Sequence, residues 1–290
     1  MTKEKTLQND KPKVGLFNRI VHSFTRMTDE RPVTRESYEE ARGVEVRIEH
    51  LDKYFDKNHV LKDINLTVKP GETFSIIGPS GTGKSVLLKH MVKLQAPDNG
   101  RVLVDGQDIN LPATTTANQQ ISYSMVFQTS ALFNSLTVGE NVGLWLREKQ
   151  VFPEARIRRI IREKLRLVGL AGKEQLQTSE LSGGMRKRVA IARSLAMNPD
   201  LILYDEPTAE LDPVTTDELA RVIENLKSMV NLTTIIVSHD LNFALYLSDR
   251  VAMMHDGKII EVGTPEEIKR SENPIIRNFI YTTTKGLRGD

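Results

Sequence analysis

The spacing of apolar and polar residues changes character along the chain. Residues 44–48 and 60–68 alternate between the two kinds, as half-exposed strands do. Between residues 136 and 178, apolar side chains recur at helical spacing among arginines. After residue 179, short apolar runs alternate with helical segments, and a continuous run such as 201–205 is typical of a sheet covered on both faces. These patterns predict an α/β protein.

Turn signals separate several of the expected strands. The turn Pro97-Asp98-Asn99-Gly100 leads into a strand at 101–106, and a further strand is expected at 124–128. A helix is expected from about 215 to 229, followed by a strand at 233–238. Two last strands, 251–255 and 258–262, flank Asp256-Gly257, and this dipeptide predicts a tight hairpin.

One segment matches the phosphate-binding pattern G-x-x-x-x-G-K-[ST]. It lies between an expected buried strand at 73–77 and an expected helix at 86–92, which is the context that the motif requires. Its glycines let backbone N–H groups approach a polyphosphate, and the helix N-terminus adds partial positive charge. Lys84 would reach the β- and γ-phosphates, and the Ser85 hydroxyl would bind Mg²⁺. The motif consists of Gly78, Pro79, Ser80, Gly81, Thr82, Gly83, Lys84 and Ser85.

Polar residues at the ends of three further strands supply candidate chemistry for hydrolysis. Asp205 would hold Mg²⁺ through a water molecule, and Glu206 would polarise the attacking water. The alternative is that these two acids only cap a strand end. His239 follows the strand at 233–238 and would hydrogen-bond the γ-phosphate, since α/β sheets bind ligands at such ends. Gln128 ends the strand at 124–128 and would sense Mg²⁺ and water.

A second glycine-rich helix start follows the helical region. The run Leu181-Ser182-Gly183-Gly184-Met185 precedes a basic helix and forms another N-terminal anion site. It cannot serve a nucleotide whose phosphates already lie on the first loop, so a second copy of the chain or a related subunit would supply the complement. Ahead of the strand at residue 60, Phe55 or Tyr54 would stack on an adenine ring.

In the order of these motifs, the chain resembles the nucleotide-binding subunits of ATP-binding-cassette transporters. The resemblance runs over about residues 43–265. It implies a P-loop NTPase cassette with a mostly parallel sheet core, an antiparallel β subdomain and an inserted α-helical subdomain at about 130–180. It also implies ATP and Mg²⁺ as cofactors, and a homodimer in which the P-loop of one copy faces the signature serine of the other.

The resemblance assigns roles by position in this sequence. Catalytic roles fall to Lys84, Gln128, Glu206 and His239, and the Mg²⁺ site to Ser85, Gln128 and Asp205. The P-loop residues, Phe55 and Val86 bind the nucleotide, with Phe55 stacking on adenine. The signature is residues 181–185, and the dimer-contacting loop is Ala209, Glu210, Leu211 and Asp212. Such loops usually have glycine or alanine where this chain has Glu210.

The subfamily is indicated by three runs, 81–86, 127–133 and 182–188, and by the tail at 273–280, which are similar to the Mla/Mce-associated ATPases. This resemblance implies transport of phospholipid or another hydrophobic substrate between bacterial membranes. The implied partners are separate transmembrane permease subunits, an Mce-domain protein and a small accessory subunit. The implied location is cytoplasmic, peripheral on the inner membrane, and the tail at 266–290 would contact the second copy.

Composition narrows the possible partners and the possible kinds of site. A net charge of +2 gives no reason to expect a nucleic-acid partner, and the absence of cysteine excludes disulfides and thiolate metal sites. No apolar run approaches the ~18 residues of a membrane span. In the N-terminal extension 1–42, a short amphipathic helix is expected, packing on its own domain or docking on a partner or lipid surface; its apolar residues are Phe17, Ile20, Val21, Phe24 and Met27.

Two other functions stay open from the sequence. One is the ATPase subunit of an importer for a polar solute such as an amino acid. The other, from a different class, is a soluble cassette ATPase acting on DNA or ribosomes. Those proteins usually carry two cassettes or a long insertion, and neither is visible in this chain.

Overall fold

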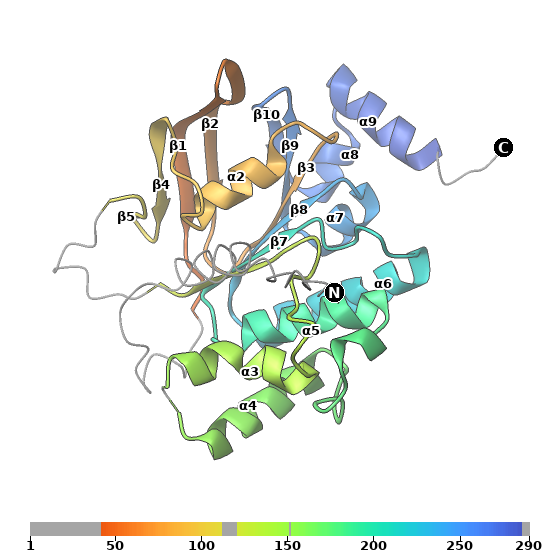
Figure 1. The fold of residues 1–290 in the computed structure, drawn as a ribbon. Helices are drawn as coiled ribbons and strands as arrows, with labels where there is room; N and C mark the ends of the chain where they lie inside the picture. Colours follow the sequence, from red (N-terminus) through yellow and green to blue (C-terminus); the bar gives the residue numbers. More distant parts are fainter. Residues whose placement is uncertain (1–41, 112–120, 151, 286–290) are drawn as a thin grey trace, which may run out of the picture.

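The computed structural model describes residues 42–111, 121–150 and 152–285 (Figure 1). The amphipathic helix expected in the N-terminal extension lies outside these residues. The described strands are β1 (Val46–Phe55), β2 (Asn58–Val68), β3 (Thr73–Ile77), β4 (Asn99–Val104), β5 (Gln107–Asp108), β6 (Tyr123–Val126), β7 (Leu201–Asp205), β8 (Thr233–Ser238), β9 (Arg250–His255) and β10 (Lys258–Gly263). The described helices are α2 (Lys84–Met91), α3 (Val138–Glu148), α4 (Glu154–Leu167), the 3₁₀ turn η2 (Thr178–Glu180), α5 (Gly183–Leu195), α6 (Pro213–Met229), α7 (Leu241–Leu247), α8 (Pro265–Lys269) and α9 (Pro274–Lys285).

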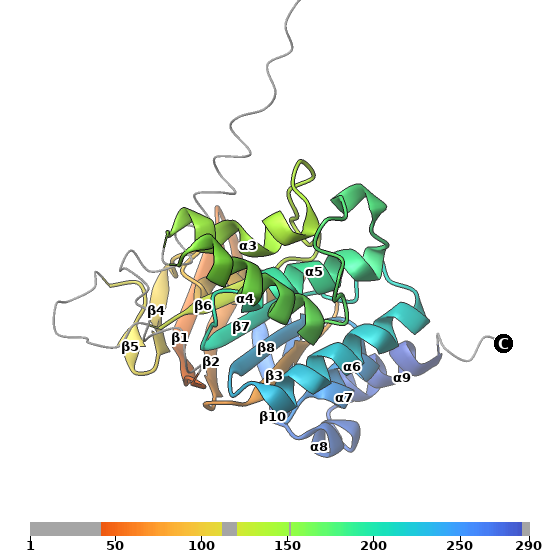
Figure 2. The same cartoon turned by 90° about the horizontal axis from the view of Figure 1, so that it is seen from below.

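The core sheet has six strands in the order β10-β9-β3-β8-β7-β6. All neighbouring pairs are parallel except β9 with β10. Every residue of β3, β7 and β8 is buried, because helices cover both faces of the sheet (Figure 2). The predicted α/β fold with a mostly parallel core is therefore confirmed.

A separate antiparallel sheet has the order β2-β1-β4-β5. Helix α2 lies between the two sheets, packing on β4 of this one and on β7 and β8 of the core (Figure 1). Strand β1 runs to Phe55, well beyond the predicted end at residue 48, because a bulge interrupts the alternation. At the bulge His50 adopts a φ of 48°, so that Ile48 and Leu51 both remain buried.

The helical segment between β6 and β7 contains α3, α4 and α5, packed on one another (Figure 2). Helix α3 starts with a capping box, in which the Thr137 hydroxyl accepts from Glu140 N and the Glu140 carboxylate accepts from Thr137 N. On α4, Ile157, Ile160 and Ile161 are buried, so the helical spacing predicted for this stretch is confirmed.

The β9–β10 hairpin turns at Asp256-Gly257, as predicted, with both residues at positive φ (45° and 75°). The turn also joins the two sheets. Lys62 of β2 donates its backbone N–H to Gly257 O (2.8 Å) and its ammonium to Asp256 Oδ1 (2.8 Å). Among the described residues, no helix combines the length and the apolar character needed to cross a bilayer.

Candidate functional site

The predicted site residues meet along the carboxyl edge of the core sheet. The P-loop follows β3, His239 follows β8, Asp205 ends β7, and Gln128 lies two residues beyond β6. Because β3, β8, β7 and β6 are consecutive neighbours, the sheet order alone places these segments side by side. Strand β6 ends at Val126 and not at Gln128, so Gln128 belongs to a loop.

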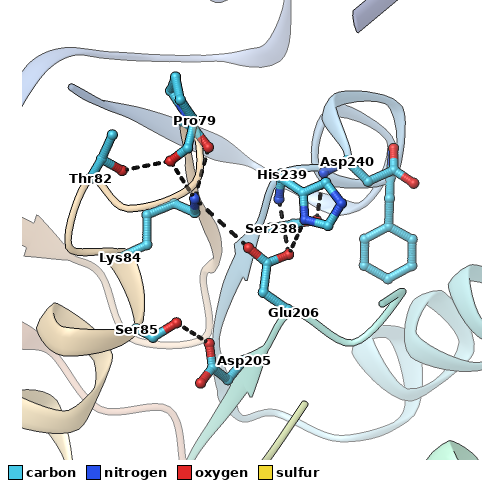
Figure 3. Close-up of polar contacts among 11 residues, drawn as sticks. Pro79, Thr82, Lys84, Ser85, Asp205, Glu206, Ser238, His239 and Asp240 are labelled. Carbon is cyan, nitrogen blue, oxygen red and sulfur yellow. Dashed lines mark hydrogen bonds and ion pairs between the residues drawn. The ribbon is translucent and has the colours of Figure 1, made fainter. Parts of the chain in front are cut away.

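The P-loop is packed closely against the backbone of strand β9. Gly78 has a φ of 151°, and a Cβ there would lie 2.1 Å from the Met254 carbonyl oxygen, so no side chain fits. Gly83, at φ 101°, is the N-cap of α2, which starts at Lys84, two residues before the predicted helix at 86–92. The Thr82 hydroxyl donates to Pro79 O (3.0 Å), closing the loop (Figure 3). The loop therefore presents backbone, not side chains, at the start of a helix.

Lys84 is folded over this loop. Its ammonium donates to Gly78 O (2.7 Å) and Pro79 O (3.0 Å), and lies 3.8 Å from Glu206 Oε1 (Figure 3). Burial lowers the pKa of Lys84, and attraction from Glu206 and Asp205 opposes this shift. The ammonium thus lies within reach of the two acids and of the space that the loop encloses.

Ser85 and Asp205 bring two oxygen ligands together. The Ser85 hydroxyl donates to Asp205 Oδ1 (2.7 Å). Burial raises the pKa of Asp205, and the Ser85 hydrogen bond opposes that shift. Among the described residues, no group of three or more His, Cys, Asp and Glu side chains could hold a metal on its own. This donor set fits Mg²⁺, which proteins typically bind through one or two oxygen ligands together with substrate phosphates.

Glu206 and His239 form a close pair. His239 Nδ1 lies 2.7 Å from Glu206 Oε2, and the His239 backbone N–H donates to the same oxygen at 3.1 Å (Figure 3). A carboxylate only accepts, so Nδ1 carries the proton in this arrangement. Glu206 adopts a φ of 47°, a conformation rare for a non-glycine residue, and its N–H donates to Val237 O. The strained backbone therefore directs its carboxylate toward β8 and the P-loop.

The two candidate adenine-stacking aromatics, Tyr54 and Phe55, are similarly exposed (41% and 44%) but have different neighbours. Tyr54 stacks on His59, with ring centroids 4.1 Å apart and an interplanar angle of 12°. Phe55 is 44% exposed and has the Lys53 ammonium 5.7 Å from its ring centroid. Phe55 thus offers an exposed ring face, whereas Tyr54 already has an aromatic neighbour.

The signature run begins α5, away from the P-loop helix. Ser182 is the N-cap, and its hydroxyl accepts from Met185 N (3.2 Å). Helix α5 packs against α3, α4, α6 and β6, whereas α2 packs against β4, β7 and β8. Ser182 is exposed, and the dimer-loop residue Leu211 lies beside Gly183. The signature and the predicted dimer loop are therefore neighbours in this structure.

The predicted dimer loop has an unusual backbone at Glu210, whose φ is 68°. Glycine adopts this conformation without strain, whereas glutamate, like any residue with a Cβ, does so only at some cost. Asp212 then caps α6, its carboxylate accepting from Thr215 N (3.0 Å) and Thr215 Oγ1 (2.6 Å). The exposed Glu210 side chain lies on the same side of the molecule as the signature.

Gly184 is required by packing, which gives a testable prediction. A Cβ at Gly184 would lie 2.3 Å from Thr215 Cγ2, whereas one at Gly183 would meet only ordinary contacts. We expect Gly184→Ala to lower the free energy of unfolding by about 1–3 kcal/mol through overpacking. Adding Thr215→Ser removes the clashing methyl, keeps the bond to Asp212, and should restore most of the loss in chemical denaturation. Gly183→Ala is the control; equal stability of both alanine variants would contradict this packing.

Sequence reasoning missed several buried cations, and Lys187 is the one that contacts a predicted site residue. The run Arg186-Lys187-Arg188 reads as a solvent-exposed basic cluster, yet Lys187 is 5% exposed and its ammonium donates to the Gln128 carbonyl. The signal was available: Lys187 lies three residues after Gly184 and four before Ile191, both buried, and these spacings define one helix face.

The chain is similar to known proteins that bind ATP for transport. Residues 61–209 match the family described as ABC transporter. Over 239 residues, 82% of the chain, it is 38% identical to the "Probable ribonucleotide transport ATP-binding protein mkl" of Mycobacterium tuberculosis and spans 67% of that protein. It is 42% identical over 243 residues to the "Spermidine/putrescine import ATP-binding protein PotA" of Thermotoga maritima, covering 83% of the chain and 64% of the relative.

A third relative is covered more completely. The chain is 39% identical over 228 residues to the "Intermembrane phospholipid transport system ATP-binding protein MlaF" of Haemophilus influenzae, covering 78% of the chain and 86% of the relative.

Two solved structures share the fold. One is the dimeric ATP-binding cassette MJ0796 in a post-hydrolysis state bound to ADP and Pi, with a TM-score of 0.67, 32% identity, and coverage of 76% of this chain and 98% of that one. The other is cbiO1 from Clostridium perfringens, part of the ABC transporter complex cbiONQ, with a TM-score of 0.71, 33% identity, and coverage of 80% and 93%.

Proposed function

The chain belongs to the ABC transporter family, and we propose that it is the ATPase subunit that energises transport of phospholipid or another hydrophobic substrate. It is an ATPase of the cassette type. The observation that supports the finer proposal is the 39% identity to MlaF over 86% of that relative's length; PotA is as similar in identity (42%) but is matched over 64% of its length.

The mechanism follows from the chain's own groups. The P-loop N–H groups and Lys84 bind the phosphates and compensate their charge. Ser85, Gln128 and Asp205, the last through a water molecule, would hold Mg²⁺, which would supply positive charge to neutralise the phosphates. Glu206 accepts the proton of the attacking water. His239 orients Glu206 through Nδ1 and lies near the position expected for the γ-phosphate.

The second half of the nucleotide site would come from another copy. Ser182, Gly183 and Gly184 present an N-terminal anion site on the surface, and they do not line the P-loop of their own chain. ATP bound on one P-loop is then covered by the signature of the partner copy. Binding closes the pair, and hydrolysis reopens it. The dimeric state of MJ0796 supports this assembly.

The remaining partners follow from the same proposal. Separate transmembrane permease subunits would contact the helical segment, because its hinge carries Gln128 and couples nucleotide state to movement. An Mce-domain protein and a small accessory subunit would complete the assembly, and the chain would act in the cytoplasm, peripheral on the inner membrane. The last helix, α9, would contact the second copy, since its exposed side chains include Tyr281 (55%).

A second candidate function is import of a polar solute, favoured by the 42% identity to PotA. Purification of the chain together with its own permease, followed by mass spectrometry of bound lipid, separates the two. We expect phospholipid to be retained at about one molecule per transporter or more, and ATPase activity to rise when phospholipid vesicles replace detergent. Stimulation by a polar solute with its binding protein, with no retained lipid, would contradict lipid transport and leave the ATPase assignment intact.

A further inference from the structure

The loop that follows β6 is held from one side by helix α5. Lys187 donates from its ammonium to Gln128 O. Arg193 donates from its two terminal nitrogens to Ala131 O (2.7 Å) and Ser130 O (2.9 Å). Both cations are buried, at 5% and 3% exposure, although lysine and arginine are rarely buried. Two side chains on one helix therefore bind three carbonyls within four consecutive residues.

We propose that Lys187 is a positioning residue for ATP hydrolysis, which fixes the backbone of Gln128 and links it to the signature at the start of the same helix. This inference rests on the proposed function. Arg193 supports the rest of the loop, so that Lys187 acts on a segment whose far end is already held.

The loop requires such support because its backbone is strained. Ser130 and Ala131 have φ values of 61° and 46°, and neither is glycine. Consecutive non-glycine residues in the left-handed region persist only where the surroundings hold them. The carbonyls that accept hydrogen bonds from Arg193 belong to these same two residues. Arg193 thus has a structural role that accounts for its burial without any part in catalysis.

Lys187 differs from Arg193 because it contacts the residue that carries chemistry. Gln128 is exposed, and within residues 42–111, 121–150 and 152–285 its side chain makes no hydrogen bond. Among these residues, the backbone alone therefore positions Gln128, and Lys187 binds the carbonyl of that backbone. Burial lowers the pKa of Lys187, and attraction from Glu210, Asp205 and Glu206 opposes this shift. One cation thus lies among the dimer loop, the acids at the end of β7 and the Gln128 loop.

Helix α5 connects the signature directly to Gln128, which belongs to the P-loop side of the same chain's nucleotide site. Lys187 lies little more than one turn after Ser182, on a helix that moves as a unit. A displacement of the signature by a bound phosphate would therefore move the carbonyl of Gln128 in the chain that donates the signature. Nucleotide binding at one site would in this way change the position of Gln128 at the other site.

The test uses the full chain assembled with its permease and compares Lys187→Met, Lys187→Arg and the control Arg188→Met. Arg188 is on the same helix and pairs with Glu218 at 3.8 Å, away from Gln128. We expect Lys187→Met to lower kcat by about 10–100-fold, the loss typical of groups that orient a ligand, with KM for ATP changed by less than about twofold. Lys187→Arg should recover most of kcat, and Arg188→Met should resemble the wild type.

Two further measurements separate positioning from a general structural role. Without nucleotide, amide hydrogen exchange in residues 127–131 should accelerate in Lys187→Met, while exchange in the core strands stays unchanged. Combined with Gln128→Ala, the Lys187→Met substitution should add no further loss of kcat, because both act through one group. Additive losses, or unchanged exchange in this loop, would overturn the proposal. If Lys187→Met does not fold, Lys187→Gln replaces it. If the wild-type protein has no ATPase activity, the proposed function is refuted. Amide hydrogen exchange in residues 127–131 would then still test the contact between Lys187 and Gln128.

Discussion

Lys84→Ala should lower kcat/KM for ATP by at least about 100-fold, the loss expected when a preorganised charge at a developing anion is removed. The structure gives the reason. The ammonium is buried at the mouth of the P-loop, held by Gly78 O and Pro79 O, and lies 3.8 Å from Glu206. Backbone N–H groups alone would then have to compensate the phosphate charge. Steady-state ATPase assays measure the loss of turnover, and titration with a fluorescent ATP analogue measures the loss of nucleotide binding.

Lys93→Ala is the matched control, because Lys93 is an exposed lysine just after α2. It removes the same charge from the same part of the chain without touching the loop, and it should leave turnover within about twofold of the wild type. If both variants lost activity equally, net charge and not phosphate contact would be responsible. If Lys84→Ala retained full turnover, the P-loop assignment would be wrong.

Glu206→Gln should remove hydrolysis while preserving ATP binding. Glutamine is nearly isosteric but cannot accept the proton of water, and loss of a general base typically lowers turnover by about 10²–10⁴-fold. The Glu206 side chain is only 12% exposed and is oriented by two contacts from His239, whereas the neighbouring acid Asp205 is bound to Ser85. Because hydrolysis would reopen the closed pair, this variant should also accumulate as an ATP-bound dimer in size-exclusion chromatography.

The control for this substitution is Glu266→Gln, at an exposed acid on α8 that pairs with Lys269. It should bind and hydrolyse ATP like the wild type. A Glu206→Gln variant with normal turnover would show that another group activates water. A variant that lost nucleotide affinity together with turnover would instead point to a role for Glu206 in holding Lys84.

Much of the fold is predictable from the sequence because local signals and tertiary contacts agree there. Asp256-Gly257 supplies the two positive φ angles that its hairpin requires. The continuous apolar strand 201–205 is buried on both faces, as the pattern indicates. The predicted end of β1 was wrong. The bulge at His50 shifts the alternation of buried and exposed residues by one position, so the pattern of alternation does not continue past residue 48.

The candidate site was predictable residue by residue, but its contacts were not. The P-loop, Asp205-Glu206 and His239 were each identified from type and position, while the 2.7 Å approach of His239 to Glu206 depends on the adjacency of β7 and β8. Lys187 was overlooked because its neighbours Arg186 and Arg188 suggest a polar face. The sequence also does not specify the stacking of Tyr54 on His59, which leaves Phe55 as the aromatic of the two without a ring neighbour among the described residues.

The central claim is that each nucleotide site combines the P-loop of one chain with the signature of another, and the absence of cysteine allows a direct measurement. Chains carrying Ser80→Cys and chains carrying Ser182→Cys, each with Glu206→Gln, are mixed with ATP and Mg²⁺ and treated with a short bis-maleimide. Both positions are exposed in the single chain. We expect a cross-linked pair containing one chain of each kind, formed only with nucleotide. No cross-link in the mixture, or one that forms equally without ATP, would contradict it.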